Sequence, residues 1–240
     1  MKAMIFAAGK GTRLKPLTNN KPKALVEVNS VPLLEIVIQK LILSGVTEII
    51  INVHYLANQI IEFLESKNNF GINIKISDET KKLLDTGGGL KKASWFFNSN
   101  EPFIVYNTDV ISNIDLKQMM EFHISNKAIA TLAVRKRISS RYFLFNDNNE
   151  LCGWKNNASN KEILIKQSTK FIELGFSGIH IINPRIFKFM PSKDRFSIVE
   201  IYLELAKKYK IKGFEHNLSF WFDIGNLRKL NEADSFLKSG

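Results

Sequence analysis

The sequence predicts an α/β protein with a mixed, mostly parallel sheet flanked by helices. Short apolar or β-branched runs alternate with amphipathic segments between residues 3 and 106. With 240 residues, the chain is long enough to bury one large hydrophobic core. The composition, 45% hydrophobic and 24% charged, is typical of a globular protein and disfavours disorder, a collagen-like repeat or a coiled coil.

The first part of the chain is expected to form the parallel part of this sheet. An apolar strand at 3–7 leads into a glycine-rich loop, and a helix at 33–43 begins after Pro32 and ends before Gly45. The other elements expected here are strands at 49–53, 72–76 and 102–106 and helices at 59–64 and 90–97.

The second part of the chain is expected to add antiparallel strands. The expected strands at 129–134, 142–145 and 151–154 are short, and a polar turn at 147–149 joins the last two. The remaining elements expected are strands at 176–182 and 220–224 and helices at 199–209 and 227–237. No linker or internal repeat divides the sequence. We therefore expect a single domain, 1–240, in which 111–240 completes the sheet begun by 1–110.

The formal net charge of +11 is the most unusual feature of the composition. The cations are 27 Lys and 7 Arg, and Lys is less suited than Arg to reading bases. Most of this charge is interpreted as a solvated surface, with a nucleic-acid partner as the alternative. The first 26 residues differ, because they hold six cations and no acid before Glu27.

Several classes of protein are disfavoured by what the sequence lacks. No apolar run approaches the roughly 18 residues of a membrane helix, and the N-terminus does not resemble a secretory signal. The one cysteine, Cys152, cannot form an internal disulfide and is interpreted as a packed thiol, so we expect a cytoplasmic protein. No Ser-His-Asp or Cys-His arrangement for nucleophilic catalysis is evident.

The glycine-rich loop after the first strand is the first candidate site. Gly9 and Gly11 can present backbone N–H groups to phosphate oxygens. The spacing is not that of a Walker A loop, and Leu14 stands where the dinucleotide fingerprint has its third glycine. Taken alone, the loop is equally well interpreted as a tight structural turn.

The residues around this loop carry a family resemblance. The stretches AAGKGTRLKPLT at 7–18 and KPKAL at 21–25 closely resemble the signature of sugar-1-phosphate nucleotidyltransferases. The resemblance implies a Rossmann-like fold, a nucleotide-binding half at 1–110 and a sugar-phosphate-binding half at 111–240. It also implies that the triphosphate is bound by the loop and two cations: Ala8, Gly9, Gly11, Thr12, Arg13 and Lys23.

A second glycine-rich segment extends the resemblance. Residues 85–90 read DTGGGL, where the family has a segment that borders the nucleobase and the sugar. This implies that Gly87 and Gly88 contact the nucleotide. Because glycine weakens a helix, three glycines entering one are interpreted as a close approach of backbone to ligand, with a loop hinge as the alternative.

Two aspartates are candidate metal ligands. Asp109 and Asp223 each follow an apolar strand, and from the residues alone each could equally be a turn former or a helix N-cap. The resemblance matches NTD at 107–109 to the family's acidic motif, here with Thr108 in place of the usual glycine. It also matches WFDIG at 221–225 to W-x-D-[IV]-G, which implies that both acids hold Mg²⁺ and that Arg13, Lys23 and Asp109 are catalytic.

The prediction of the substrates depends on shorter segments of the sequence. Segments at 52–56, 77–79 and 176–179 resemble the branch of N-acetylmuramate 1-phosphate uridylyltransferases and short mannose-1-phosphate guanylyltransferase-like proteins. This implies UTP first and GTP next, a sugar 1-phosphate partner, a role in cell-wall recycling, and a nucleotide contact from His54. The family's E-K-P tripeptide, whose lysine holds the sugar phosphate, is absent, so Lys155 or Lys166 is expected to replace it near Gly178.

Two other function classes stay open at this point. A non-catalytic nucleotide-binding module would keep the loop, but it would be expected to lose an acid or Lys23, and all are present. A nucleic-acid binder would bind with a steep salt dependence. The sequence does not distinguish a monomer from a homodimer.

Overall fold

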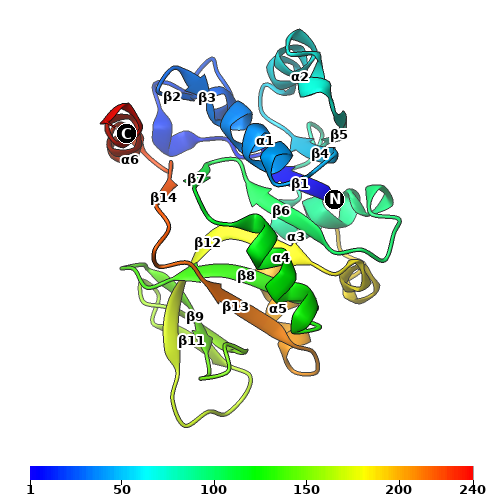
Figure 1. Ribbon diagram of the computed structural model, residues 1–240, viewed down its shortest axis with the longest axis vertical. Helices are drawn as coiled ribbons and strands as arrows, with labels where there is room; N and C mark the ends of the chain where they lie inside the picture. The colour runs from blue at the N-terminus through cyan, green and yellow to red at the C-terminus, as the bar shows by residue number, and fades with distance from the viewer. Residues whose placement is uncertain (240) are drawn as a thin grey trace.

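The computed structural model describes residues 1–239 (Figure 1). The α-helices are α1 (Leu33–Leu43), α2 (Ala57–Ser66), α3 (Asp85–Lys92), α4 (Leu116–Ser125), α5 (Ile198–Ala206) and α6 (Leu227–Ser239). Short 3₁₀ helices are η1 (Thr12–Leu14), η2 (Lys23–Leu25), η3 (Asn68–Gly71), η4 (Ser94–Phe96) and η5 (Pro184–Phe189). Among these residues, no helix is long and apolar enough to cross a membrane.

The strands divide between the two halves of the chain. The first half contributes β1 (Lys2–Phe6), β2 (Glu27–Val28), β3 (Val31–Pro32), β4 (Glu48–Val53), β5 (Asn73–Asp78), β6 (Phe103–Asn107) and β7 (Val110–Ser112). The second half contributes β8 (Ala130–Arg135), β9 (Arg141–Phe145), β10 (Leu151–Asn156), β11 (Lys161–Leu164), β12 (Ile172–Ile182), β13 (Ile211–Glu215) and β14 (Trp221–Asp223).

Ten strands form one mixed sheet in the order β11-β10-β9-β12-β6-β1-β4-β5, with β8 paired to β12 and β13 to β8. The part built by β5, β4, β1 and β6 is parallel. The long strand β12 runs antiparallel to β6 and joins this part to the antiparallel strands β8 and β9. The predicted α/β fold class is confirmed, and the antiparallel strands lie where the turn at 147–149 predicts them.

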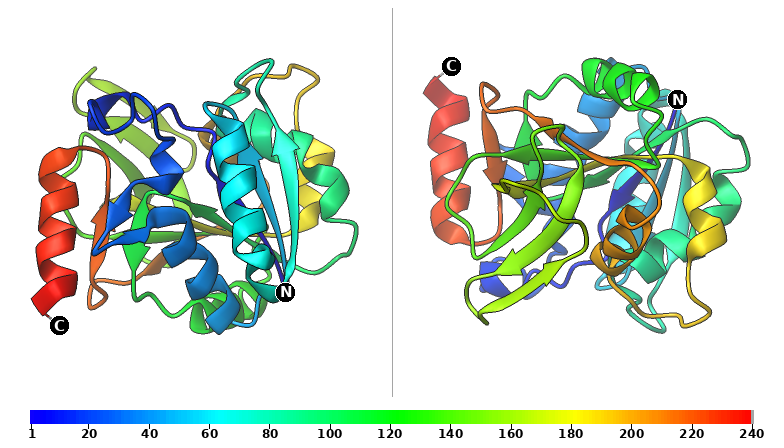
Figure 2. Two further views of the ribbon diagram at one scale, coloured as in Figure 1. Left: turned by 90° about the horizontal axis from the view of Figure 1, so that it is seen from above. Right: turned by 90° about the horizontal axis from the view of Figure 1, so that it is seen from below.

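Helices cover both faces of the sheet because the side chains of its strands alternate between two apolar cores. Ala3 and Ile5 of β1 face the core that contains α1, α2 and α4, whereas Met4 faces the core that contains α3 and α5. A smaller cluster lies under α6, which packs beside β2 and β14 at one side of the molecule (Figure 2). The β7–β14 pair lies close to this cluster, since Ile111 of β7 belongs to it.

Most expected elements are present, and the differences have local causes. The helix expected at 90–97 is wrong in its bounds, because α3 begins at Asp85 and ends at Lys92. Helix α4 was not expected; its N-cap is Asp115, whose carboxylate accepts hydrogen bonds from the backbone N–H groups of Lys117 and Gln118. The strands β2, β3, β7, β11 and β13 were also not expected. All of these except β13 have four residues or fewer, too few for their alternation to be recognised.

Candidate active site

A cavity of about 280 Å³ opens where β1 and β6 end, the edge of an open α/β sheet at which ligands commonly bind. Its walls come from the loop after β1, from η2, from the ends of β4, β5 and β6, and from the start of α3. The lining residues are Phe6, Ala7, Ala8, Gly9, Lys23, Asn52, Glu79, Leu83, Asp85, Thr86, Asn107, Thr108, Asp109 and Arg195.

The glycine-rich loop leaves its backbone donors free. Gly11 adopts a left-handed conformation with φ of 63°, and a Cβ there would lie 3.0 Å from both Lys23 Cβ and Thr18 Cγ2. The Thr18 hydroxyl donates a hydrogen bond of 2.8 Å to the Gly11 carbonyl and fixes the turn. Within residues 1–239, the backbone N–H groups of 8–11 donate to no protein acceptor. A phosphate could therefore accept from them.

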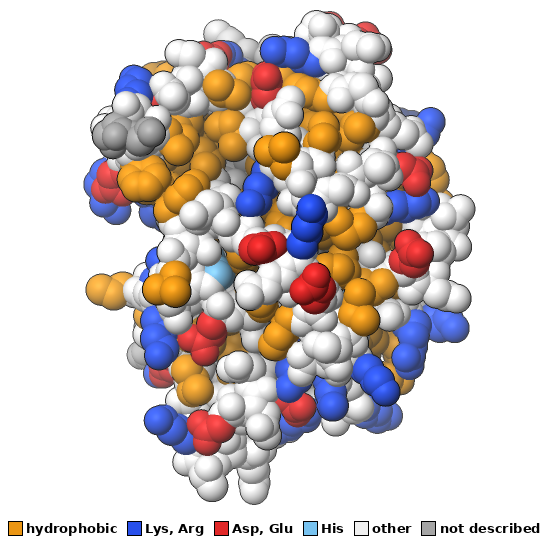
Figure 3. Space-filling view, in the orientation of Figure 1, with side chains coloured by type: hydrophobic (Ala, Val, Ile, Leu, Met, Phe, Trp, Pro, Cys, Tyr) orange, Lys and Arg blue, Asp and Glu red, His pale blue; other side chains and the backbone are white. Residues whose placement is uncertain are grey.

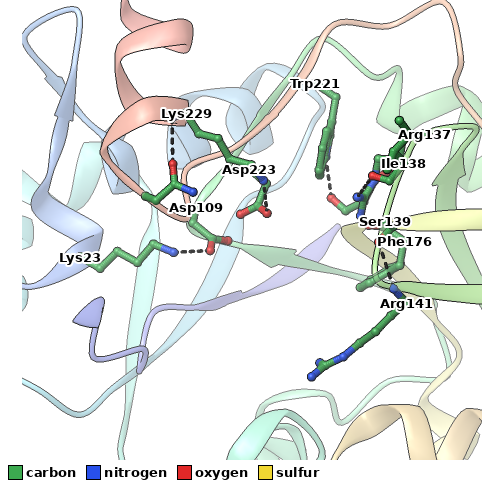
Figure 4. A network of polar contacts seen from close by, with 12 residues as sticks. Lys23, Asp109, Arg137, Ile138, Ser139, Arg141, Phe176, Trp221, Asp223 and Lys229 are labelled. Carbon is green, nitrogen blue, oxygen red and sulfur yellow. Dashed lines mark hydrogen bonds and ion pairs between the residues drawn. The ribbon is translucent and has the colours of Figure 1, made fainter. Parts of the chain in front are cut away.

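Lys23 and Asp109 meet at this cavity from distant parts of the chain. Lys23 begins η2, and Asp109 lies in the turn between β6 and β7. The Lys23 ammonium forms a short ion pair with Asp109 Oδ2 (Figure 4), and the two side chains are only 12% and 24% exposed. The structure thus brings together two residues that lie 86 positions apart in the sequence.

Asp223 lies beside Asp109 because β14 pairs with β7. The register sets Asp223 opposite Val110, and the Ile224 N–H donates a hydrogen bond of 2.8 Å to the Asp109 carbonyl. Lys229 of α6 donates to Asp223 Oδ2 at 3.0 Å. Arg13 also belongs to this group, since a Cβ placed on Gly225 would lie 3.3 Å from Asp223 Oδ1 and 3.4 Å from Arg13 Nη2.

The two aspartates have the donor chemistry that Mg²⁺ prefers. Each carboxylate has one oxygen paired with a lysine, while its other oxygen, Oδ1, accepts no hydrogen bond within the described chain. Mg²⁺ is commonly held by one or two carboxylates together with substrate phosphates. No cluster of three or more acidic, His or Cys side chains occurs in residues 1–239. A substrate-completed site therefore fits better than a closed protein cage.

The glycines of α3 are explained by protein packing. Gly87 and Gly88 lie inside α3 and do not line the cavity. A Cβ on Gly87 would collide with the Phe196 ring, and one on Gly88 with the Asp194 carbonyl. The interpretation that a ligand approaches these α-carbons is wrong, because the segment 194–196 occupies that space. Whether they touch the nucleotide stays a prediction.

A buried polar pair lines the cavity and was not among the predicted site residues. Asn52 of β4 accepts a hydrogen bond from the Ala7 N–H at 2.8 Å and donates to Glu79 Oε1 at 2.7 Å. Glu79, 1% exposed, also accepts from the Leu84 N–H at 3.0 Å. The pair fixes the start of the glycine-rich loop. The signal in the sequence was one asparagine within the apolar run of β4.

Three other lining residues were also missed. Asp85 has a φ of 63°, which is unusual for a residue other than glycine, and it begins α3 beside Thr86. Arg195 reaches the cavity from the connection before α5 and has no protein partner in the described chain. It brings a positive charge to the cavity in addition to that of Lys23. Its place could not be read from the sequence, because it depends on how that connection packs on α3.

Eight further predicted residues lie outside this lining: Gly11, Thr12, Arg13, His54, Lys155, Lys166, Gly178 and Asp223. His54 follows β4 and does not line the cavity. Gly178 lies next to the Asp109 turn, since a Cβ on it would lie 2.8 Å from Val110 Cγ2. Lys155 and Lys166 also do not line the cavity. Each pairs with an acid instead, Lys155 with Glu173 at 2.7 Å and Lys166 with Glu150 at 3.7 Å.

Comparisons with known proteins show what the chain is similar to. The family profile described as Nucleotidyl transferase matches residues 2–240. A mannose-1-phosphate guanyltransferase of Yarrowia lipolytica is 31% identical over 229 residues, which cover 94% of this chain and 61% of the relative. An N-acetylmuramate alpha-1-phosphate uridylyltransferase of Neisseria meningitidis serogroup B is 29% identical over 241 residues, which cover 98% of this chain and 97% of that protein.

Solved structures share the fold. HddC from Yersinia pseudotuberculosis, in complex with GMP-PN, superposes with a TM-score of 0.77 at 22% identity, covering 98% of this chain and 99% of HddC. A UDP-glucose pyrophosphorylase in complex with UDP-glucose superposes with a TM-score of 0.78 at 18% identity, covering 100% and 99% of the two chains. The present chain spans about 61% of the length of the guanyltransferase relatives it matches.

Proposed function

The chain belongs to the nucleotidyl transferase family, and on this premise we propose that it transfers a nucleoside monophosphate from a nucleoside triphosphate to a sugar 1-phosphate. One observation carries the proposal. A loop with free backbone N–H groups, two cations and two carboxylates gather at one edge of the sheet, although they come from distant parts of the chain. These are the groups that a reaction between two phosphate anions requires.

The residues have separable roles in the proposed reaction. An oxygen of the sugar phosphate attacks the α-phosphorus of the triphosphate, and the bond to the β-phosphate breaks to release pyrophosphate. The free N–H groups of 8–11 with Arg13 and Lys23 bind the triphosphate and neutralise the charge that develops on it. No side chain needs to form a covalent intermediate, and no Cys, Ser or His occurs among the described residues that line the cavity.

Asp109 and Asp223 would hold Mg²⁺, which when bound supplies positive charge to the phosphate oxygens of the substrate. In the absence of substrate, Lys23 pairs with Asp109 and Lys229 with Asp223, so neither carboxylate is left without a counter-charge. We expect Lys23 to donate to a phosphate oxygen when the triphosphate enters, since its ammonium already lies at the cavity.

We propose UTP and N-acetylmuramate 1-phosphate as the substrates. The support is the Neisseria meningitidis relative with that printed activity, which aligns over 97% of its length. GTP with mannose 1-phosphate, or another hexose 1-phosphate, is the second candidate, because guanyltransferases are similar at 31% identity. We also propose that His54, Gly87 and Gly88 contact the nucleotide.

A substrate panel tests the proposal. UTP, GTP, CTP, dTTP and ATP are each combined with the 1-phosphates of N-acetylmuramate, N-acetylglucosamine, glucose and mannose, with Mg²⁺, and pyrophosphate release is measured. We expect the highest kcat/KM for UTP with N-acetylmuramate 1-phosphate. The Asp109→Asn variant, prepared in the same way, controls for contaminating enzymes. Pyrophosphate release from none of the pairs by folded protein would contradict the proposal.

A further inference from the structure

Trp221 lies at the start of the strand that carries Asp223. Its indole N–H donates a hydrogen bond of 2.9 Å to the Ser177 carbonyl of β12. Strand β14 has only three residues and pairs only with β7 among the described strands. The indole therefore provides a second attachment, which ties β14 to the central sheet.

Three cations lie around the Trp221 ring, and Arg137 is the nearest. Its guanidinium carbon lies 4.7 Å from the ring centroid, against 5.9 Å for Arg135 and 6.0 Å for the Lys229 ammonium. A cation at this distance from an indole is attracted by the ring and is worth more when it is partly desolvated. Lys229 also donates to Asp223 (Figure 4), so the ring and the carboxylate share a neighbour.

Strand β12 also contacts Arg137 and holds its side chain in place. Its Nη2 donates a hydrogen bond of 2.9 Å to the Phe176 carbonyl. Gly175 provides the space, because a Cβ there would lie 2.7 Å from Arg137 Nε and 2.8 Å from Cγ. The register between β12 and β8 shifts after Phe176, next to this contact. Strand β12, its Gly175 and Arg137 thus form one packed unit beside the Trp221 indole, called the bracket below.

The bracket carries a charge that is costly to bury. Arg137 is partly buried and forms no ion pair within residues 1–239, and its Nε is buried without a hydrogen-bond partner. Burial lowers the pKa of Arg137, and the negative charge of Asp223 is the largest influence that opposes this effect. A structural residue could fill this space at lower cost, so the charge points to a role toward Asp223.

We propose that Arg137 is a positioning residue, which fixes Trp221 against β12 and thereby sets the place of Asp223 relative to Asp109. This rests on the proposed function, because the two carboxylates must converge on the same cation. Partners that orient metal ligands typically change metal affinity by 10–100-fold when they are removed. Arg137 contacts neither carboxylate directly, so its effect would pass through the indole.

Two variants isolate this role. Arg137→Gln removes the positive charge beside the indole. Gly175→Ala keeps Arg137 but places a methyl group where the Arg137 side chain lies. We expect both to raise the Mg²⁺ concentration for half-maximal turnover about tenfold, with KM for the nucleoside triphosphate within twofold at saturating Mg²⁺. Arg137→Lys should recover most of the loss, because it keeps a cation near the ring. Arg185→Gln is the matched control, since Arg185 also lies over an aromatic ring, at 6.0 Å from Tyr209, but outside the site.

Hydrogen exchange tests the same bracket without turnover. In Arg137→Gln and Gly175→Ala, the backbone amides of 220–225 should exchange at least tenfold faster, while those of β1 and β4 keep their protection and Arg185→Gln matches the wild type. Unchanged exchange at 220–225, or faster exchange with an unchanged Mg²⁺ requirement, would overturn the proposal. If no substrate pair is turned over, the proposed function fails. The positioning role of Arg137 is then tested by the affinity of each variant for Mn²⁺, measured by electron paramagnetic resonance in place of the Mg²⁺ requirement.

Discussion

Lys23 and Asp109 illustrate how single residues define this site. Their ion pair joins a residue in a 3₁₀ turn to one at the end of a core strand, and both side chains are largely withdrawn from water. A partly buried carboxylate without a counter-charge would be unfavourable, so the lysine stabilises the site before any ligand enters. In the proposed reaction, the triphosphate would bring negative charge to Lys23, and Mg²⁺ would bring positive charge to Asp109. The pair is thus suited to exchange partners.

Replacement of Asp109 by Asn tests the proposed role of Asp109 in holding Mg²⁺. The substitution keeps the size of the side chain but removes the negative charge, and we expect kcat to fall by about 10³-fold or more, because charge stabilisation in the transition state is lost. Pyrophosphate release measures the change. Asp147→Asn is the matched control, since Asp147 is an exposed turn acid. A loss of less than tenfold in Asp109→Asn, with circular dichroism unchanged, would refute the assignment.

The sequence indicated both aspartates by residue type, but it could not show that they meet. Asp109 and Asp223 are separated by more than a hundred positions and become neighbours only through the three-residue β7–β14 pair. The same holds for Arg137, whose place depends on Gly175 and on a register shift in β12. Long-range pairing of short strands leaves little trace in local patterns. Lys155 and Lys166 do not line the cavity, and their role toward the sugar phosphate stays a prediction.

At the scale of elements, hydrophobic periodicity predicted the bounds of an element well where that element has one clear apolar face. Helix α1 has the expected bounds because its apolar residues recur at helical spacing between Pro32 and Gly45. Helix α3 was placed five residues too late, because Gly87, Gly88 and Gly89 are poor helix formers. Tertiary packing on 194–196 compensates for that weakness. The helix is thus specified by its neighbour more than by its own sequence.

Gly88→Ala is a sharp test of that packing. In an ordinary helix the change from Gly to Ala is stabilising by about 1 kcal/mol. Here the added methyl would meet the Asp194 carbonyl, so we expect a loss of about 2 kcal/mol or more in the free energy of unfolding. Urea denaturation at neutral pH measures it.

Gly9→Ala provides the comparison for this substitution. A Cβ on Gly9 meets nothing within 4 Å, and its φ is not positive, so its free energy of unfolding should stay within about 0.5 kcal/mol of the wild type. Equal stability of the two variants would show that the segment 194–196 can move aside. In that case the close approach to α3 would not be what requires glycine at position 88.

At the scale of the whole molecule, the net charge of +11 is not concentrated in one place on the face that Figure 3 shows. Lys and Arg side chains are dispersed there, with Asp and Glu between them. A polymer-binding surface usually gathers its cations along one stripe or patch. We therefore expect weak binding to duplex or single-stranded DNA at about 0.15 M salt, measured by fluorescence anisotropy. Tight binding with a steep salt dependence would revive the nucleic-acid interpretation.

Buried histidines determine how the whole fold should respond to mild acid. His123, His180 and His216 are at most 5% exposed, and burial lowers their pKa values to about 4, 3 and 4. Each has a neutral partner, the hydroxyl groups of Thr131, Tyr202 and Ser177. In the unfolded chain a histidine has a pKa of about 6.5, so below that pH only the unfolded state takes up the proton.

The sign of the effect follows directly. Well above pH 6.5 these histidines are neutral in both the folded and the unfolded state and do not change stability with pH. As the pH falls from 7 to 5.5, each should lower the free energy of unfolding by about 1 kcal/mol, because the unfolded state binds more protons. Carboxylates remain ionised in this window, which isolates the histidines. Urea denaturation at several pH values gives the slope, and His54→Gln is the matched control, because His54 is the one histidine of the four that is only partly buried. His123→Gln should reduce the slope by about a third, and a free energy of unfolding that is constant from pH 7 to 5.5 would contradict the burial of all three.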